Sequence, residues 1–198
     1  MALVFSLFAI ATIFVIPFMK LYTTGADIDY IDWRLPLLFV TYKLLNYGRN
    51  TSNNIISFSG AFKETQWRAW LETIINLVVS FVCVFKFGIY GVLFGTIIAL
   101  LYRANDIIIF ANCKLLKRSA WGTYRRWGIN IILFCITICI GVSLPLYMET
   151  YIALILNAAW VSVGVFIIFF GINSLIEIKA RKIAQRYLKN ILCKIKKG

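Results

Sequence analysis

Long apolar runs, separated by short polar segments, constrain the fold of this chain more than any other feature of its sequence. A bilayer core is about 30 Å thick, and a helix of roughly 17–25 residues crosses it. Hydrophobic residues make up 61% of the chain and charged residues 15%, whereas a soluble domain has about 45–50% and 25%. The sequence therefore predicts an all-α integral membrane protein with six transmembrane helices. The expected spans are residues 1–19, 36–59, 69–85, 89–110, 129–144 and 151–175.

The basic residues are distributed unevenly, and this predicts the orientation. The chain has 21 Lys and Arg against 8 Asp and Glu, a net charge of +13. Many of the basic residues lie in residues 112–128 and in the tail, 176–198, whereas the loop at 20–35 is rich in Asp. The positive-inside rule then places both basic segments and both termini in the cytoplasm. Nucleic-acid binding is not expected, because no basic face extends over a folded domain.

The tail, residues 176–198, is predicted to form a basic amphipathic helix. Apolar residues recur in it at helical spacing, and lysines and arginines occupy the other side. Such a helix would lie on an anionic membrane surface. The alternative is a solvated tail without a fixed partner.

The second expected span, residues 36–59, carries the candidate functional residues. Asn46, Arg49 and Asn53 share one helix face. A cation inside a bilayer costs about 2.5–3.5 kcal/mol on insertion scales, so Lys43 and Arg49 need a partner or a water-filled cavity. Ammonium and guanidinium groups bind phosphate well. The predicted substrate path is Lys43, Asn46, Arg49, Asn50 and Asn53, and the alternative is that these side chains join helices.

Two further polar pairs lie in the expected spans. Glu72 and Asn76 are four residues apart, which indicates either a coupling site for a proton or cation or a structural pair. For Glu72 the structural alternative is an ion pair with Arg68, Lys63 or Arg49. Arg103 and Asp106 are three residues apart and are expected to pair with each other.

The sequence favours neither an enzyme nor a cofactor site. It contains no His, which removes the commonest general base and metal ligand. None of the five Cys forms a CxxC pair, so neither a zinc site nor a disulfide framework is expected. No nucleophile–base pair or carboxylate dyad is recognisable.

Several segments together resemble bacterial polysaccharide flippases. They are GAFKETQW at 60–67, INL at 75–77, KFGIYGVLFGTIIALLYR at 86–103 and NCKLLKRS at 112–119. This ordered set, within residues 1–118, resembles the C-terminal half of the Wzx-type oligosaccharide-lipid transporters. These belong to the MOP superfamily, which also contains the MATE antiporters.

The resemblance implies a partial MATE-like bundle. Residues 1–111 would supply four helices of the C-terminal lobe, 112–128 a cytoplasmic basic loop, 129–175 two additional spans and 176–198 the tail. It also implies export of undecaprenyl-pyrophosphate-linked sugars across the inner membrane, for O-antigen, lipopolysaccharide or related polysaccharides, through a cationic cavity. The partners would be the lipid-linked oligosaccharide, membrane lipids and an N-terminal lobe that this sequence lacks or a partner chain. The chain would then be a fragment or one part of a split protein.

Two other functions remain open from the sequence. One is a MATE-like exporter of small molecules, in which acidic or aromatic residues would be expected to bind cationic ligands. The other is a membrane scaffold that transports nothing.

Overall fold

The computed structural model describes residues 1–24, 32–144 and 150–176, and these ranges are helical without any strand. The predicted all-α fold is thereby confirmed for this part of the chain. The elements are α1 (Ala2–Tyr22), α2 (Arg34–Phe58), α3 (Phe62–Phe87), α4 (Ile89–Ile109), a π-helix η1 (Phe110–Leu115), α5 (Trp121–Ser143) and α6 (Tyr151–Ile176).

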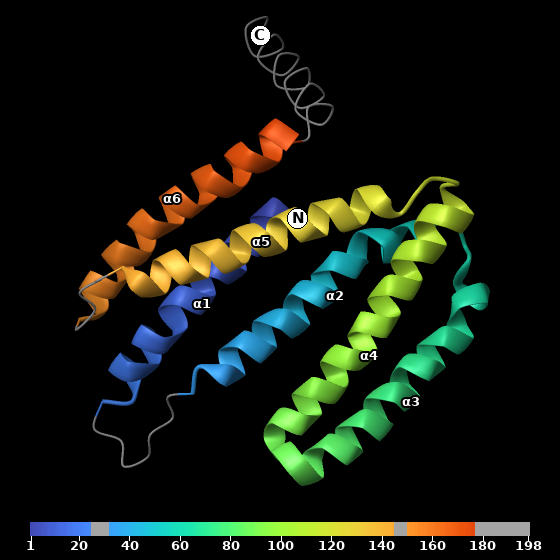
Figure 1. Ribbon diagram of the computed structural model, residues 1–198, viewed down its shortest axis with the longest axis horizontal. Coiled ribbons are helices and arrows are strands. Elements are labelled where there is room, and N and C mark those ends of the chain that lie inside the picture. Colours follow the sequence, from blue (N-terminus) through green and yellow to red (C-terminus); the bar gives the residue numbers. More distant parts are fainter. Residues whose placement is uncertain (25–31, 145–149, 177–198) are drawn as a thin grey trace, which may run out of the picture.

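The helices form two groups of three. In the α2–α3–α4 group, α4 packs along both α2 and α3. In the α1–α5–α6 group, α1 packs along both α5 and α6. Figure 1 shows the two groups side by side, with α1 and α2 adjacent where the groups meet. Each group therefore has its own central helix.

An apolar core joins α2 to the α1–α5–α6 group. Phe5 and Ala9 of α1 are fully buried in it, together with Phe169 of α6. The ring of Phe5 meets that of Phe134 edge to face at 6.3 Å. The remaining buried members of this core are Val40, Leu44, Leu133 and Val165.

Five of the described helices are long and apolar enough to span a membrane: α1, α3, α4 with η1, α5 and α6. The fifth and sixth predicted spans agree with α5 and α6, although α5 begins earlier. The second predicted span is a helix, α2, but it does not reach the apolarity of the other five. Its second half is too polar, and this is the part that contains Arg49 and the four asparagines.

The α3–α4 turn is short, in agreement with the three residues left between the third and fourth predicted spans. Gly88 has a φ of 56°, a left-handed conformation that favours glycine, and it ends α3 and begins α4. A Cβ at Gly91 would lie 2.4 Å from the carbonyl carbon of Cys83. The two helices therefore approach each other at backbone distance, as small residues in membrane helices permit.

Two segments that the sequence analysis left outside the predicted spans are largely helical, which corrects it. Between the second and third predicted spans, residues 60–68, only the stretch up to residue 61 is a turn, because α3 already begins at Phe62. Of the loop expected at residues 112–128, only residues 116–120 lie outside helices. Lysine and arginine are good helix formers, so a run of basic residues does not by itself end a helix. Pro17, expected near the end of the first span, lies inside α1.

The two groups meet directly at Gly48 of α2. A Cβ at this position would lie 1.8 Å from Cζ2 of Trp127 on α5, so only glycine leaves room for the indole ring. A second link is the hydroxyl of Tyr124, which donates to Oδ1 of Asn105 on α4 at 2.8 Å. The amphipathic helix predicted for the tail lies outside the described residues, apart from Ile176 at the end of α6.

Candidate functional site

The polar side chains of α2 lie along one continuous arc of the helix. At 100° per residue, the arc begins at Arg49, passes Lys43 and ends at Tyr47. It covers about 160° of the helix circumference. The opposite side of α2 is buried through Leu45 and Ser52. All five residues of the predicted substrate path lie on this arc: Lys43, Asn46, Arg49, Asn50 and Asn53.

The structure divides these five residues into two sets. Asn46 and Arg49 are half-buried, and Arg49 Nε donates to Asn46 Oδ1 at 3.2 Å. Lys43, Asn50 and Asn53 are exposed. The predicted path is therefore one helix face, but only part of it is open.

Arg49 binds a carboxylate on another helix. Its Nη1 donates to Oε1 of Glu72 on α3 at 2.8 Å. Both side chains are about one-fifth exposed, at 22% and 23%. Of the three partners considered for Glu72, Arg49 is the one it binds. Arg49 therefore joins α2 to α3, two helices that otherwise touch mainly through α4.

This ion pair belongs to a larger network across α2, α3 and α4. Arg103 of α4, with only 8% of its side chain exposed, pairs with Glu72 at 3.5 Å and with Asp106 at 3.0 Å. The predicted Arg103–Asp106 pair is thus confirmed. Asp106 also accepts a hydrogen bond from Arg68 of α3. We call Arg49, Arg68, Arg103, Glu72 and Asp106 the charge network.

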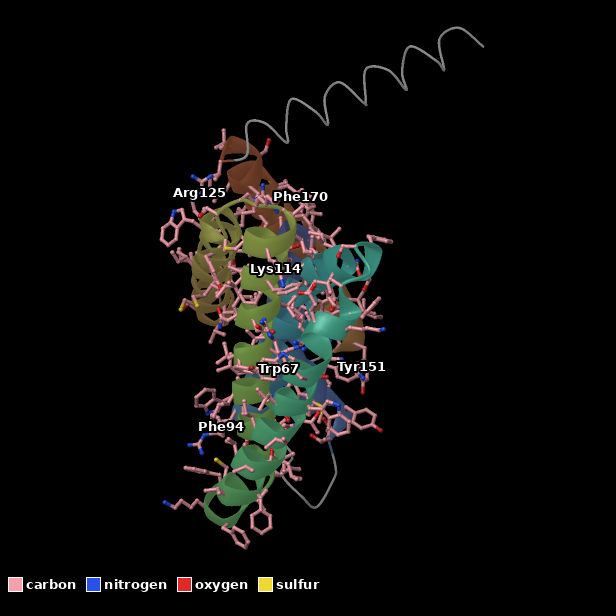
Figure 2. The ribbon with its side chains drawn as sticks, turned by 90° about the vertical axis from the view of Figure 1, so that its right-hand side faces the viewer. Trp67, Phe94, Lys114, Arg125, Tyr151 and Phe170 are labelled. Carbon is pink, nitrogen blue, oxygen red and sulfur yellow. The ribbon has the colours of Figure 1, made fainter. Side chains whose placement is uncertain are left out.

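The charge network has one positive charge more than its carboxylates can balance. Three guanidinium groups share two carboxylates, so its formal charge is +1. Buried arginines are satisfied by such multiple pairs because each carboxylate oxygen accepts a separate hydrogen bond. In Figure 2, nitrogen and oxygen atoms gather between α3 and α4 near the labelled Trp67.

Sequence reasoning found only part of this network. It predicted the Arg103–Asp106 pair and left Arg49 as one of three partners for Glu72. It missed the contacts of Arg68 with Asp106 and of Arg103 with Glu72. Only the Arg103–Asp106 pair lies within one helix, and it alone has the three-residue spacing that a sequence shows. Arg68 was left just outside the third predicted span, residues 69–85, whereas it lies in the second turn of α3 and stacks on the ring of Phe110 at 5.4 Å. The sequence feature that could have identified Arg68 as part of a network is its charge next to the start of a long apolar run.

Asn76, the second member of the pair with Glu72, has different partners. Its Oδ1 accepts hydrogen bonds from the hydroxyls of Ser80 at 3.0 Å and Thr96 at 3.3 Å. Thr96 lies on α4, so Asn76 joins α3 to α4. Glu72 and Asn76 share a helix face, as predicted, but each makes its own interhelical contacts.

Lys43 differs from the three arginines of the charge network in having no carboxylate partner among the described residues. Its ammonium lies 5.3 Å from the centre of the Tyr42 ring, a cation–π contact within the same helix. Asn50 and Asn53 are exposed about two and three turns further along the helix. This open part of α2, which we call the α2 polar face, consists of Lys43, Asn50, Asn53 and Asn54.

The three cavities described in the structure lie elsewhere. The first, of about 350 Å³, lies between α1 and the start of α2 and includes Asp32. The second, of about 520 Å³, lies between α1 and the end of α5 and includes Lys20. The third, of about 500 Å³, lies between the start of α2 and the α3–α4 turn. Neither Lys43 nor Arg49 lines any of them.

The described residues contain no group of three or more His, Cys, Asp or Glu that could hold a metal ion. The arrangement is one of hydrogen-bond donors and cations on apolar helices. Such groups bind anions and hydroxyl groups by charge-assisted and neutral hydrogen bonds.

These features define the chain as an all-α protein whose five apolar helices are those of a multi-pass membrane protein. No family model, curated protein or solved structure matches it.

Proposed function

We propose that the chain forms part of a transporter that moves an undecaprenyl-pyrophosphate-linked oligosaccharide across the bacterial inner membrane. In this proposal the basic ends of the helices and both termini are cytoplasmic, and α2 crosses the membrane as a sixth span. The C-terminal lobe of a MATE-like bundle is the fold that the sequence resemblance suggests.

The exposed α2 polar face is the observation that carries the proposal. Lys43 lies nine residues after Arg34, about 13 Å along the helix and so near the middle of a core about 30 Å thick. A cation at this depth, with three amides seven to eleven residues further along α2, would not face acyl chains, because these groups lack hydrogen-bond partners there. They require either a water-filled passage or another protein surface, and a transport path between two lobes provides both.

The charge network supports an anionic cargo. Its excess positive charge and the unpaired Lys43 make the α2–α3–α4 group electropositive. A cationic ligand, as expected for a MATE-like exporter, would be repelled by these groups. Arg49 is held by Glu72, so we assign it a positioning role and assign the contact with substrate to Lys43, Asn50 and Asn53.

The test is a complementation assay in cells that make the protein. Deleting its coding sequence should abolish surface polysaccharide, and the wild-type chain should restore it. Lys43→Gln should lower export about tenfold, because a charge-assisted hydrogen bond contributes about 1.5–3 kcal/mol. Lys43→Arg should retain most of the export, since it keeps the charge.

Lys63→Gln is the matched control, because Lys63 is also an exposed lysine but lies in the first turn of α3. It should export normally. Protein amounts in the membrane are measured for every variant. Full export by Lys43→Gln at a normal protein amount would contradict the path, and normal polysaccharide in the deletion strain would favour a scaffold.

A further inference from the structure

The third cavity combines apolar walls with a single cation. It lies where the first turn of α2 faces the α3–α4 turn, and Figure 1 shows both at the same end of the molecule. Its volume is about 500 Å³, within the range of about 300–1,000 Å³ typical of small-molecule sites. Leu37 and Leu38 line it from α2, and Phe87 and Phe94 line it from α3 and α4. Phe94 is labelled toward this end of the molecule in Figure 2.

Arg34 is the only basic residue among those that line this cavity. Its guanidinium lies 5.8 Å from the centre of the Trp33 ring and has no carboxylate partner among the described residues. Asp32, the acid nearest to Arg34 in the sequence, accepts hydrogen bonds from groups other than the Arg34 guanidinium. Its Oδ1 accepts from the backbone N–H of Arg34 at 2.9 Å, and its Oδ2 accepts from the hydroxyl of Tyr90.

These contacts fix the start of α2 while leaving the guanidinium of Arg34 available. The Tyr90–Asp32 hydrogen bond joins the start of α4 to the residues just before α2. It therefore holds together the two sides of the cavity. Trp33 and Arg34 are residue types that occur at the membrane–water boundary, where a lipid phosphate also lies.

We propose that this cavity binds one anionic phospholipid. Its phosphate pairs with the Arg34 guanidinium, which presents a planar set of donors suited to phosphate oxygens. One acyl chain lies against Leu37, Leu38, Phe87 and Phe94. The cavity has one charged group at its rim and mainly apolar walls elsewhere. A ligand that matches both is amphipathic, with an anionic headgroup and an apolar chain.

The headgroup, and not the acyl chain, determines selectivity at this cavity. An acyl chain gains little by leaving bulk lipid for an apolar wall, because the bilayer is equally apolar. Phosphatidylcholine carries the same phosphate but adds a cationic choline that Arg34 repels. The net negative charge of the headgroup beside Arg34 is therefore the discriminating contribution. The cavity between α1 and α2 is comparably apolar but carries Asp32 and no cation, so an anionic lipid should avoid it.

Native mass spectrometry of the full chain tests the site. Delipidated protein in detergent is exposed to equal amounts of phosphatidylglycerol and phosphatidylcholine, and the bound lipid is counted. One phosphatidylglycerol should be retained in preference to phosphatidylcholine. Arg34→Gln should weaken its binding about fivefold, which corresponds to one basic residue near an anionic headgroup, and Arg34→Lys should largely restore it.

Lys86→Gln is the matched control, because Lys86 is an exposed cation in the last turn of α3 and does not line the cavity. It should bind phosphatidylglycerol as the wild type does. Leu37→Trp, which keeps Arg34 and fills the cavity, should also lose the lipid. Equal binding of both lipids by the wild type, or loss in Lys86→Gln but not in Arg34→Gln, would overturn the proposal. Displacement of phosphatidylglycerol by equimolar polyprenyl phosphate would overturn the phospholipid as occupant.

Discussion

The two groups of helices are held together by different interactions. In the α2–α3–α4 group, three arginines and two acids pair across all three helices, and Asn76 adds a link between α3 and α4. In the α1–α5–α6 group, the described core contacts are apolar and aromatic, and polar links include an amide pair between Asn130 of α5 and Asn173 of α6. Both groups consist of helices of similar length.

This difference indicates which part of the chain has a role beyond packing. Apolar helices in a membrane associate through close van der Waals contact and a few hydrogen bonds, and the apolar core of the α1–α5–α6 group is of this kind. Charged groups are costly at the same depth and are retained where they serve binding, transport or a specific pairing. The α2–α3–α4 group therefore carries the candidate function, and the other group supports it through the core around Phe5 and Val40.

The largest effect is expected from removing an acid of the charge network. Glu72→Leu leaves Arg49 without a carboxylate and raises the formal charge of the network from +1 to +2. Removing one partner of a buried ion pair costs about 3–5 kcal/mol, because the charge of the other partner is then uncompensated. We expect a loss of this size in the free energy of unfolding, measured in mixed micelles.

Arg103→Met is the informative comparison for Glu72→Leu. It removes the most buried arginine but leaves two arginines to balance two carboxylates, Arg49 with Glu72 and Arg68 with Asp106. The free energy of unfolding should therefore fall less than in Glu72→Leu. If Arg103→Met is the more damaging change, packing of the arginine outweighs charge balance in this group.

A smaller effect, of opposite sign in the two groups, is expected at helical glycines. Gly91→Ala brings a methyl group against the backbone of Cys83, and such overpacking costs about 1–3 kcal/mol. Gly164→Ala on α6 meets nothing within 4 Å and should gain about 0.5–1 kcal/mol from helix propensity. Thermal unfolding of both variants measures the difference, and a loss in both would show that α6 is as closely packed as α4.

The helices could be predicted from the sequence because apolar runs of this length have few alternatives in a membrane. The tight turn at Gly88 and the helical regions of α4 and α6 follow from local residues. The residues at which α3 and α5 begin could not be predicted in the same way. Residues 62–68 and 121–128 are polar but contain no residue that must end a helix, so polarity was wrongly taken as a sign of a loop.

The candidate site was predictable as a helix face but not as a network. The spacing of Asn46, Arg49 and Asn53 identified the arc on α2, since helical periodicity depends on sequence alone. The pairing of Arg49 with Glu72 depends on how α2 and α3 pack around α4, and a sequence leaves several partners open. Likewise, the sequence alone does not show why residue 48 is glycine. The reason is the indole ring of Trp127, which packs against it in the folded protein.

The smallest effect is expected at the amide pair of the α1–α5–α6 group. Asn130 and Asn173 exchange two hydrogen bonds, at 3.2 and 3.0 Å, and Asn130 is fully buried. Such interhelical bonds contribute about 0.6–2 kcal/mol, so Asn130→Leu should lower the free energy of unfolding by about that amount. The double variant with Asn173→Leu should cost no more than the single one, because no amide is then left unpaired between the helices. A double-mutant cycle in mixed micelles measures this coupling, and fully additive losses would mean that the two side chains act separately.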